Sequence, residues 1–405
     1  MKPGPDRLVI NRETLISRRT ATLLLGSCLL GPVQAVAATA PSPLANEIVA
    51  RSQLSAGDPA RLMRVFDKAR RGESITLGVI GGSITEGAFA STKKSSYPGR
   101  VLDWWRAQFP RCDIRMVNAG AGGTGSMYGA LRVANDLLSS RPDFVIVEFA
   151  VNDNWTDGEA FEGLVRQILA QSDLPAVLLL FMMWEKGGND QAMQAKVGAH
   201  YHLPMVSFRD ALWPEIEAGR LKWSDYIVDT VHPTDAGHAA AARLITAMCD
   251  KALRTGPARE PKAESALPLP LVSDAFQHVR WLEAAALDPV RNEGWRLDLN
   301  DKGTAAWSSA TASGRIAFDW SGTGLVVVFS DPAVNPRRIR FSVDGAPFQT
   351  LDALKQPKRP ILVLAQNLAQ GPHIVELQCT DDGNNDEAAT DIRLRGIASI
   401  GVARD

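Results

Sequence analysis

Five apolar runs between residues 75 and 208 constrain the fold of this chain more than any other feature of its sequence. Most of these runs are apolar at nearly every position, and a polar segment of helical length separates each run from the next. In chain order the runs read ITLGVI, DIRMVNA, PDFVIVEFA, PAVLLLFMM and LPMVSF. Continuous rather than alternating apolar residues are typical of strands that are buried on both faces. The pattern therefore predicts an α/β domain in which helices cover both faces of a parallel sheet.

A second domain is expected because the chain has 405 residues, which exceeds the usual size of one core. The segment RTGPAREPKAESALPLPLP is rich in Pro, Ala and charge. It indicates a linker at residues 255–280, after an α/β domain at 41–254. From about Trp295 onward, short β-type runs are separated by Gly, Asp, Asn or Pro. This spacing predicts an all-β, jelly-roll-like sandwich at 281–405.

The first 40 residues differ in kind from the rest of the chain. A basic, polar start leads into TATLLLGSCLLGPVQAVAATA, an apolar stretch that ends in small residues and predicts a signal peptide at 1–40. Arg18 and Arg19 resemble a twin-arginine signal, and a lipoprotein signal around Cys28 is the alternative. The apolar run continues beyond Cys28, which argues against a lipoprotein. We expect export to the bacterial periplasm or the extracellular space, without a membrane span.

Charge and cysteine content limit the expected partners. The formal net charge of -1 gives no basic field, so nucleic acid is not an expected partner. Loss of the signal peptide would leave Cys112, Cys249 and Cys379. A bridge between Cys112 and Cys249 is one interpretation, and buried free thiols are the other, which we favour. No oligomeric state is predicted.

Polar and glycine-rich segments follow the predicted strands. GGSITEG places Ser83 after the first strand, VNAGAGGTG places Gly123 after the second, and EFAVNDNW places Asn152 after the third. Ligands of open α/β sheets bind beyond the carboxyl ends of the strands, so these residues are expected to converge on one crevice. DTVHP follows the last strand, with Asp229 three residues before His232. This spacing suits a carboxylate that orients an imidazole toward a serine.

These four segments resemble the sequence blocks of the SGNH (GDSL-like) hydrolase superfamily. GGSITEG stands in place of the GDS block, NAGAGG in place of the oxyanion-glycine block, AVND in place of GxND, and DTVHP in place of DxxHP. The resemblance covers residues 76–253 and implies a flavodoxin-like sheet. It implies Ser83 as nucleophile, His232 as base and Asp229 as its orienting partner. It also implies an oxyanion hole made by the Ser83 amide, Gly123 and the Asn152 side chain.

Two positions depart from the pattern of this superfamily. Gly82 replaces the Asp of GDS, and Ala150 replaces the first Gly of GxND. Neither departure removes a catalytic group, and both indicate a divergent branch. Gly122 lies beside Gly123, which leaves the oxyanion donor open between two neighbouring amides.

The resemblance implies a serine esterase that works through an acyl-enzyme and needs neither metal nor cofactor. Exported superfamily members joined to jelly-roll-like domains resemble carbohydrate esterases that remove acetyl groups from polysaccharides. We therefore expect hydrolysis of short-chain, O-acetyl esters on a carbohydrate. The alternatives are a lipase-like or thioesterase-like hydrolase of longer acyl chains, and a non-catalytic glycan-binding protein.

Tryptophans near the predicted crevice are candidate substrate contacts. Trp155 follows Asn152 closely and Trp184 ends the fourth strand, so either could stack on a sugar or wall an acyl pocket. Packing beneath the loops is the alternative for both. Further tryptophans among the C-terminal strands suit either a carbohydrate-binding surface or the core, and sequence alternation favours the core. These are Trp295, Trp307 and Trp320.

Overall fold

A computed structural model gives the fold of the chain. It describes residues 44–153, 158–254, 267–299, 304–309, 313–330, 338–351, 361–380 and 392–402. The predicted signal peptide at 1–40, residues 255–266 of the predicted linker, and Trp155 lie outside the described residues.

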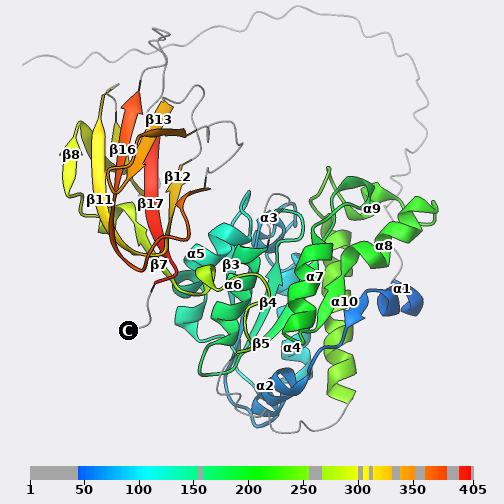
Figure 1. The fold of residues 1–405 in the computed structure, drawn as a ribbon. Coiled ribbons are helices and arrows are strands. Elements are labelled where there is room, and N and C mark those ends of the chain that lie inside the picture. The colour runs from blue at the N-terminus through cyan, green and yellow to red at the C-terminus, as the bar shows by residue number, and fades with distance from the viewer. Residues whose placement is uncertain are drawn as a thin grey trace, which may run out of the picture. The chain divides into compact units, whose positions relative to one another are not determined.

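A six-stranded sheet forms the centre of the N-terminal α/β domain (Figure 1). Its strand order is β1-β6-β5-β4-β2-β3, in which β2 to β6 run parallel and β1 runs antiparallel to β6. The strands are β1 (Gln53–Ser55), β2 (Ile75–Gly81), β3 (Ile114–Gly120), β4 (Phe144–Glu148), β5 (Ala176–Phe181) and β6 (Met205–Ser207). The predicted parallel sheet is confirmed, and the short antiparallel strand β1 was not expected.

Successive residues of the central strands point into two different cores. In β2, Leu77 and Val79 belong to one cluster of buried side chains and Ile80 to the other. In β4, Ile146 and Val147 divide in the same way. Successive side chains of a strand point to opposite faces. Continuous apolar runs are therefore required, because each face of the sheet is buried beneath helices.

The first core lies under α2, α4, α8 and α10, and the second lies under α5, α6 and α7 (Figure 1). The helices are α1 (Asn46–Arg51), α2 (Ala60–Arg70), α3 (Ser83–Glu86), α4 (Tyr97–Gln108), α5 (Ser126–Asp136), α6 (Glu159–Leu169), α7 (Gln191–His200), α8 (Phe208–Glu217), α9 (Trp223–Tyr226) and α10 (Asp235–Arg254). Short 3-10 helices are η1 (Leu138–Ser140), η2 (Glu185–Gly187), η3 (Ala275–Gln277) and η4 (Ala284–Ala286).

Helix α6 is buried along most of its length, including its charged residues Glu162 and Arg166. Residues 268–277, part of the predicted linker, cover the side of α6 that carries these charges. The Glu162 carboxylate accepts hydrogen bonds from the amides of Leu271, Val272 and Ser273 at 2.5, 2.6 and 3.0 Å. Arg166 donates to the Pro268 carbonyl at 2.7 Å. The second half of the predicted linker therefore packs on the α/β domain.

Two antiparallel sheets form the C-terminal domain. One has the order β15-β12-β17-β10-β9, with β7 also paired to β17, and the other has the order β14-β13-β16-β11-β8. The strands are β7 (Val279–Glu283), β8 (Arg291–Glu293), β9 (Trp295–Leu299), β10 (Ala305–Ser309), β11 (Arg315–Gly322), β12 (Gly324–Phe329), β13 (Arg338–Val343), β14 (Gln349–Leu351), β15 (Ile361–Ala365), β16 (Gly371–Thr380) and β17 (Ile392–Ile400). The predicted all-β architecture is confirmed.

The tryptophans of this domain serve mainly as core. Trp295 and Trp320 are 5% and 6% exposed, and both belong to the core between the two sheets. Trp307 is half-buried, and its indole donates to the Ala284 carbonyl at 3.0 Å. Trp295 and Trp320 therefore do not provide an exposed surface for stacking on a sugar.

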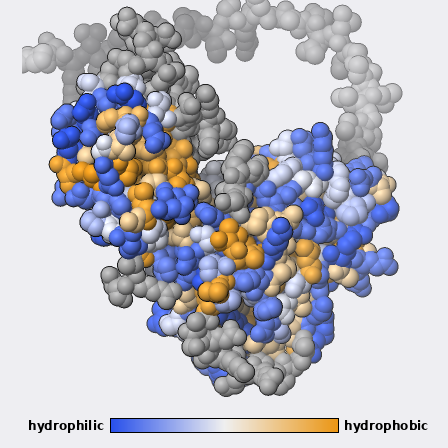
Figure 2. Space-filling model, viewed as in Figure 1, coloured by the Kyte–Doolittle hydropathy of each residue, from blue (hydrophilic) through white to orange (hydrophobic). Residues whose placement is uncertain are grey.

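The distribution of polar and apolar residues on the surface follows from the arrangement of the helices and strands. On the face of the molecule that Figure 2 shows, the helical domain is mostly hydrophilic, and apolar residues gather mainly over the strands of the β domain. Helices that cover a sheet turn their apolar side inward and leave a polar side for water. Among the described residues, no helix is long and apolar enough to cross a membrane.

Candidate active site

The backbone between β2 and α3 turns through a crowded space that only glycine fits. A Cβ atom on Gly82 would lie 2.5 Å from Oδ1 of Asn152, and one on Gly81 would lie 2.1 Å from the Thr85 hydroxyl oxygen. Both distances are far below van der Waals contact. Gly82 therefore lies in close contact with the Asn152 side chain.

Ser83, His232 and Asp229 form a continuous chain of hydrogen bonds. Ser83 begins α3, and its Oγ lies 2.8 Å from Nε2 of His232. The other ring nitrogen, Nδ1, lies 2.7 Å from Oδ2 of Asp229. The structure therefore brings together the three side chains that the sequence singled out, at the carboxyl end of the parallel sheet.

Asp229 is held as a carboxylate. Burial alone would raise its pKa, but hydrogen bonds from the His232 amide, the His232 ring and the Val231 amide outweigh burial and lower the pKa to about 2. Both amides donate to Oδ1 at 2.8 Å, so Oδ2 remains for the imidazole. An ionised carboxylate accepts the Nδ1 proton, which leaves Nε2 of His232 as an acceptor facing the serine hydroxyl.

The loop between α9 and α10 that carries Asp229 and His232 is fixed by contacts from both sides. The Val228 amide donates to the His232 carbonyl at 2.8 Å and closes the loop. The Trp223 indole donates to the Asp229 carbonyl at 2.9 Å. From the segment after β5, the Glu185 amide donates to the Thr230 carbonyl at 2.7 Å. The imidazole is therefore positioned before any substrate binds.

The loop after β3 separates the two candidate oxyanion glycines. The Gly122 amide donates to Oε2 of Glu86 at 2.9 Å. Gly123 has a φ of +69°, a conformation that favours glycine, and its amide has no acceptor within the described part of the chain. Of the two neighbouring amides, that of Gly123 is available to a ligand. Glu86 fixes this loop and was not identified from the sequence.

Asn152 and Asp153 follow β4 and have different partners. Asn152 lies against Gly82, beside the turn that leads into Ser83. Asp153 is buried and accepts hydrogen bonds from the Ser126 amide at 2.7 Å and the Gln194 side chain at 2.9 Å. Burial, reinforced by the nearby charge of Asp190, raises the pKa of Asp153 to about 7. Asp153 thus ties the start of α5 to the loop after β4, a role that its place in the AVND block did not reveal.

The remaining candidates lie in different places. Trp184 is half-buried, follows β5 and directly precedes Glu185, which contacts the loop of His232. His238 is fully buried; Nδ1 accepts from the Tyr97 amide at 3.2 Å, and Nε2 donates to the Ala88 carbonyl at 3.1 Å. No disulfide joins Cys112, Cys249 and Cys379 in the part of the chain that the structure describes. Among the described residues, no group of three or more His, Cys, Asp or Glu side chains is arranged to hold a metal ion.

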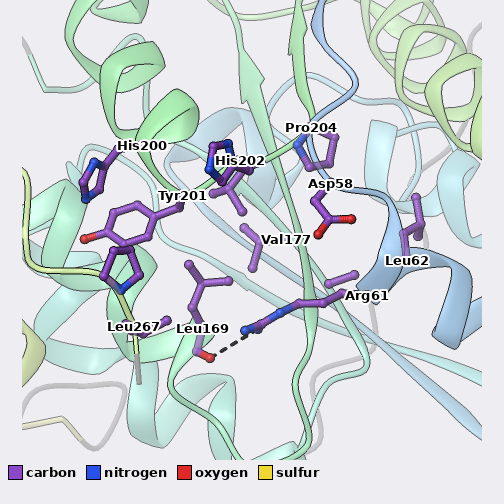
Figure 3. Close-up of a pocket in the computed structure, with 13 residues that line it drawn as sticks. Asp58, Arg61, Leu62, Leu169, Val177, His200, Tyr201, His202, Pro204 and Leu267 are labelled. Atoms are coloured by element: carbon purple, nitrogen blue, oxygen red, sulfur yellow. Dashed lines mark hydrogen bonds between the residues drawn. The ribbon is translucent and has the colours of Figure 1, made fainter. Parts of the chain in front are cut away.

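A separate cavity of about 420 Å³ opens at the other end of the sheet (Figure 3). It lies where β5 and β6 begin, whereas Ser83 follows the end of β2. Its lining includes Asp58, Arg61, His200, Tyr201 and His202. The Arg61 guanidinium donates to the carbonyls of Leu169 and Pro175, both at 3.2 Å. The cavity is therefore not part of the site that Ser83, His232 and Asp229 form.

Comparisons with known proteins agree with this architecture. Residues 79–240 match the model of the GDSL-like Lipase/Acylhydrolase family. The chain is similar to a two-domain esterase (CEX) active on acetylated mannans, with 30% identity over 88% of this chain and 99% of that chain, and a TM-score of 0.79. The same esterase co-crystallized with mannopentaose gives a TM-score of 0.78 at the same identity and coverage. An acetylxylan esterase of Geobacillus stearothermophilus is 22% identical over 208 residues, which are 42% of this chain and 92% of that protein.

Proposed function

Because this chain belongs to the GDSL-like lipase and acylhydrolase family, we propose that it removes O-acetyl groups from a polysaccharide, with Ser83 as the nucleophile. The chain is a carboxylic ester hydrolase. One observation carries the proposal: Ser83, His232 and Asp229 are already joined by hydrogen bonds of 2.8 and 2.7 Å, in a site where no described residue engages the Gly123 amide. A serine, a base and an orienting carboxylate in this order are the groups that acyl transfer requires.

The first half of the reaction transfers the acetyl group to the enzyme. The Ser83 oxygen attacks the ester carbonyl carbon while its proton passes to Nε2 of His232. The carbonyl oxygen becomes an oxyanion, which the amides of Ser83 and Gly123 and the Asn152 side chain stabilise. The tetrahedral intermediate collapses, the bond to the sugar oxygen breaks, and the His232 proton passes to that oxygen. The sugar hydroxyl leaves, and acetyl-Ser83 remains.

The second half regenerates the enzyme with the same groups. A water molecule gives a proton to Nε2 of His232 and attacks the acetyl carbon. Collapse of this second intermediate breaks the bond to the Ser83 oxygen, which recovers the proton, and acetate leaves. Asp229 stays ionised throughout and stabilises the imidazolium that forms in each half.

An acetylated mannan is the substrate that the similarities favour. The similarity to the mannan-active esterase covers 88% of this chain, which includes the α/β domain and strands of the β domain. The similarity to the acetylxylan esterase covers only 42% of this chain. A similarity that spans both domains is a better guide to a polymer substrate than one that spans a single domain, since fold alone does not fix function.

We also propose that the protein is exported, and we propose the bounds of its domains. Residues 1–40 are proposed as an export signal, 41–254 as the catalytic domain, 255–280 as the connecting segment and 281–405 as the β-sandwich. The basic start, apolar stretch and small-residue end of the first segment support export. Expression of the full chain in a bacterium, followed by N-terminal sequencing of the periplasmic protein, is expected to give a start near Ala38 or Pro41. A periplasmic protein that retains Met1 would contradict the export signal.

The central test is acetate release from a panel of acetylated polysaccharides. The wild type is expected to release acetate from acetylated mannan, and Ser83→Ala is expected to release none above background. Ser139→Ala is the matched control, because Ser139 is exposed and lies beyond the far end of α5. A chain-length series of alkyl esters separates the alternatives. Preference for long acyl chains would favour a lipase or thioesterase, and no turnover of any ester would leave a glycan-binding protein.

A further inference from the structure

An exposed aromatic ring lies directly beside the imidazole of His232. Phe89 is 58% exposed, and its ring centroid lies 5.3 Å from that of His232, with an angle of 38° between the planes. Most large apolar side chains of the described α/β domain are buried in its two cores. Phe89 instead presents an apolar surface to solvent at the site where a substrate must bind.

The backbone of Phe89 adopts a conformation that is unfavourable for a residue with a side chain. Its φ of +59° lies in the left-handed region, which glycine occupies without a steric penalty. Strained backbone of this kind persists when the surrounding structure enforces it, and it is concentrated at functional sites. Glycine would adopt this φ without strain. The phenylalanine at position 89 therefore adds an exposed ring to a turn that does not need one.

Hydrogen bonds made by residues on both sides of Phe89 hold the backbone of its loop in place. The Ala88 amide donates to the Ser83 carbonyl at 2.9 Å, and the Ala88 carbonyl accepts from Nε2 of His238 at 3.1 Å. Beyond the ring, the Ser91 amide and hydroxyl donate to the Asp235 carboxylate at 2.8 and 2.5 Å. Asp235 and His238 both belong to α10, the helix that begins just after His232. The loop that carries Phe89 is therefore anchored on both sides to the helix that follows His232.

The direction of the proposed reaction determines which part of the substrate meets Phe89. His232 must return its proton to the sugar oxygen that leaves, so this oxygen lies next to Nε2. The carbonyl oxygen of the ester points to Gly123 and Asn152 instead. The sugar that carries the ester therefore lies on the His232 side of the site, and the acetyl group lies on the oxyanion side.

We propose that Phe89 is a specificity-determining residue, on whose exposed face the pyranose ring that carries the acetyl group stacks. The inference rests on the proposed function and adds the group that selects a sugar over other alcohols. The C–H face of a pyranose is apolar, and it can cover an aromatic ring while the sugar hydroxyls remain in water. The strained, doubly anchored loop offers this ring already oriented, so little conformational entropy is lost when the sugar binds.

The test compares two esters that share the acetyl group and differ in the alcohol. Acetylated mannooligosaccharides supply a pyranose, and ethyl acetate supplies an alcohol without a ring. Phe89→Gly removes the ring and suits the left-handed backbone, so the fold is expected to persist with a thermal midpoint near that of the wild type. For this variant we expect kcat/KM on the oligosaccharide to fall roughly tenfold, mainly through KM, and to stay within about twofold on ethyl acetate. Phe89→Trp is expected to retain the oligosaccharide activity.

Each outcome separates this inference from the proposed function. Equal losses on both esters would overturn the inference, because Phe89 would then only support the imidazole. Unchanged activity on both esters would also overturn it. A wild type that hydrolyses ethyl acetate but releases no acetate from the oligosaccharides would refute the proposed function, and the inference with it. Leu54→Ala, which trims an exposed apolar residue of β1, is the matched control and is expected to change neither rate.

Discussion

Replacement of Glu148 by Gln is expected to make the protein more stable at alkaline pH. Glu148 ends β4 and is fully buried; its Oε2 accepts from the Thr85 hydroxyl at 2.9 Å, and Oε1 has no partner among the described residues. Burial raises the pKa of Glu148 to about 8, and the charge of Asp153 adds to this, although the Thr85 hydrogen bond opposes it. In the folded protein the side chain is therefore a neutral acid at pH 7.

The sign of the pH dependence follows from the two states. Below pH 4.5, Glu148 is protonated in the folded and the unfolded chain, so it has no effect on the pH dependence of stability. Between pH 4.5 and 8 the unfolded chain releases a proton that the folded chain keeps, and the free energy of unfolding falls with rising pH. The loss is about 1.4 kcal/mol per pH unit, or about 4 kcal/mol between about pH 5 and about pH 8. A glutamine side chain at this position would not titrate and would avoid this loss.

Urea unfolding at about pH 5 and about pH 8, followed by tryptophan fluorescence, measures the effect. The free energies of the variant and the wild type are expected to be similar at the lower pH, and the variant is expected to be the more stable at the higher pH. Asp153 is present in both proteins, so its titration largely cancels in the difference. Exposed Glu217 supplies the control Glu217→Gln, which makes the same chemical change at the surface. A Glu148→Gln difference that is the same at both pH values would refute the reasoning.

Further substitutions test the site and the covering of α6. Asp229→Asn, which removes the acceptor of the Nδ1 proton, is expected to lower kcat about 10³- to 10⁴-fold with little change in KM, measured on a soluble acetyl ester. Asn152→Ala is expected to lower kcat about 10²- to 10³-fold by removing an oxyanion donor. Gly82→Ala is also expected to lower kcat, because the new Cβ would displace the Asn152 side chain. Full activity of this variant would show that the space beside Gly82 can accept a side chain. Glu162→Gln is expected to destabilise the fold by about 2 to 4 kcal/mol at about pH 7 in urea unfolding. Burial opposes the ionisation of Glu162, but hydrogen bonds from Tyr201 and three amides lower its pKa. The ionised side chain therefore stabilises the fold above the pKa of the unfolded chain, and this stabilisation is lost in acid. A difference in unfolding free energy between variant and wild type that is equal at neutral and acidic pH would contradict this.

The central sheet was predictable because β2, β4 and β5 are buried on both faces and therefore appear in the sequence as nearly uninterrupted apolar runs. Strand β1 (Gln53–Ser55) was not predictable in this way. It has three residues, and its burial pattern is mostly partial exposure. Its place in the sheet comes from pairing with β6, a long-range contact that leaves no periodic signal in three residues.

Ser83, Gly123 and Asn152 could be singled out because each follows the carboxyl end of a strand. Asp229 and His232 could be singled out by their spacing of three residues. Phe89 and Glu148 carry no such signal. Phe89 is one apolar residue in a polar loop, and its place beside His232 depends on anchors from α10, far along the chain. Glu148 stands inside an apolar strand run, and its partner Thr85 becomes its neighbour only when β2 and β4 pair.

Helix α6 shows what composition alone could not reveal about residues 268–277 of the predicted linker. Glu162 and Arg166 lie one turn apart, as charged residues on the polar side of a surface helix do, and the Pro-rich segment after residue 254 has the composition of a free connection. In the structure, the charged residues of α6 and the Pro-rich segment are hydrogen-bonded to each other. The Glu162 carboxylate accepts three consecutive amides of this segment, and a buried carboxylate is stable only when its hydrogen bonds are satisfied. An α/β domain truncated at residue 254 would uncover the place on α6 where Phe276 packs and leave Glu162 without these three donors, so the connecting segment contributes to the stability of α6.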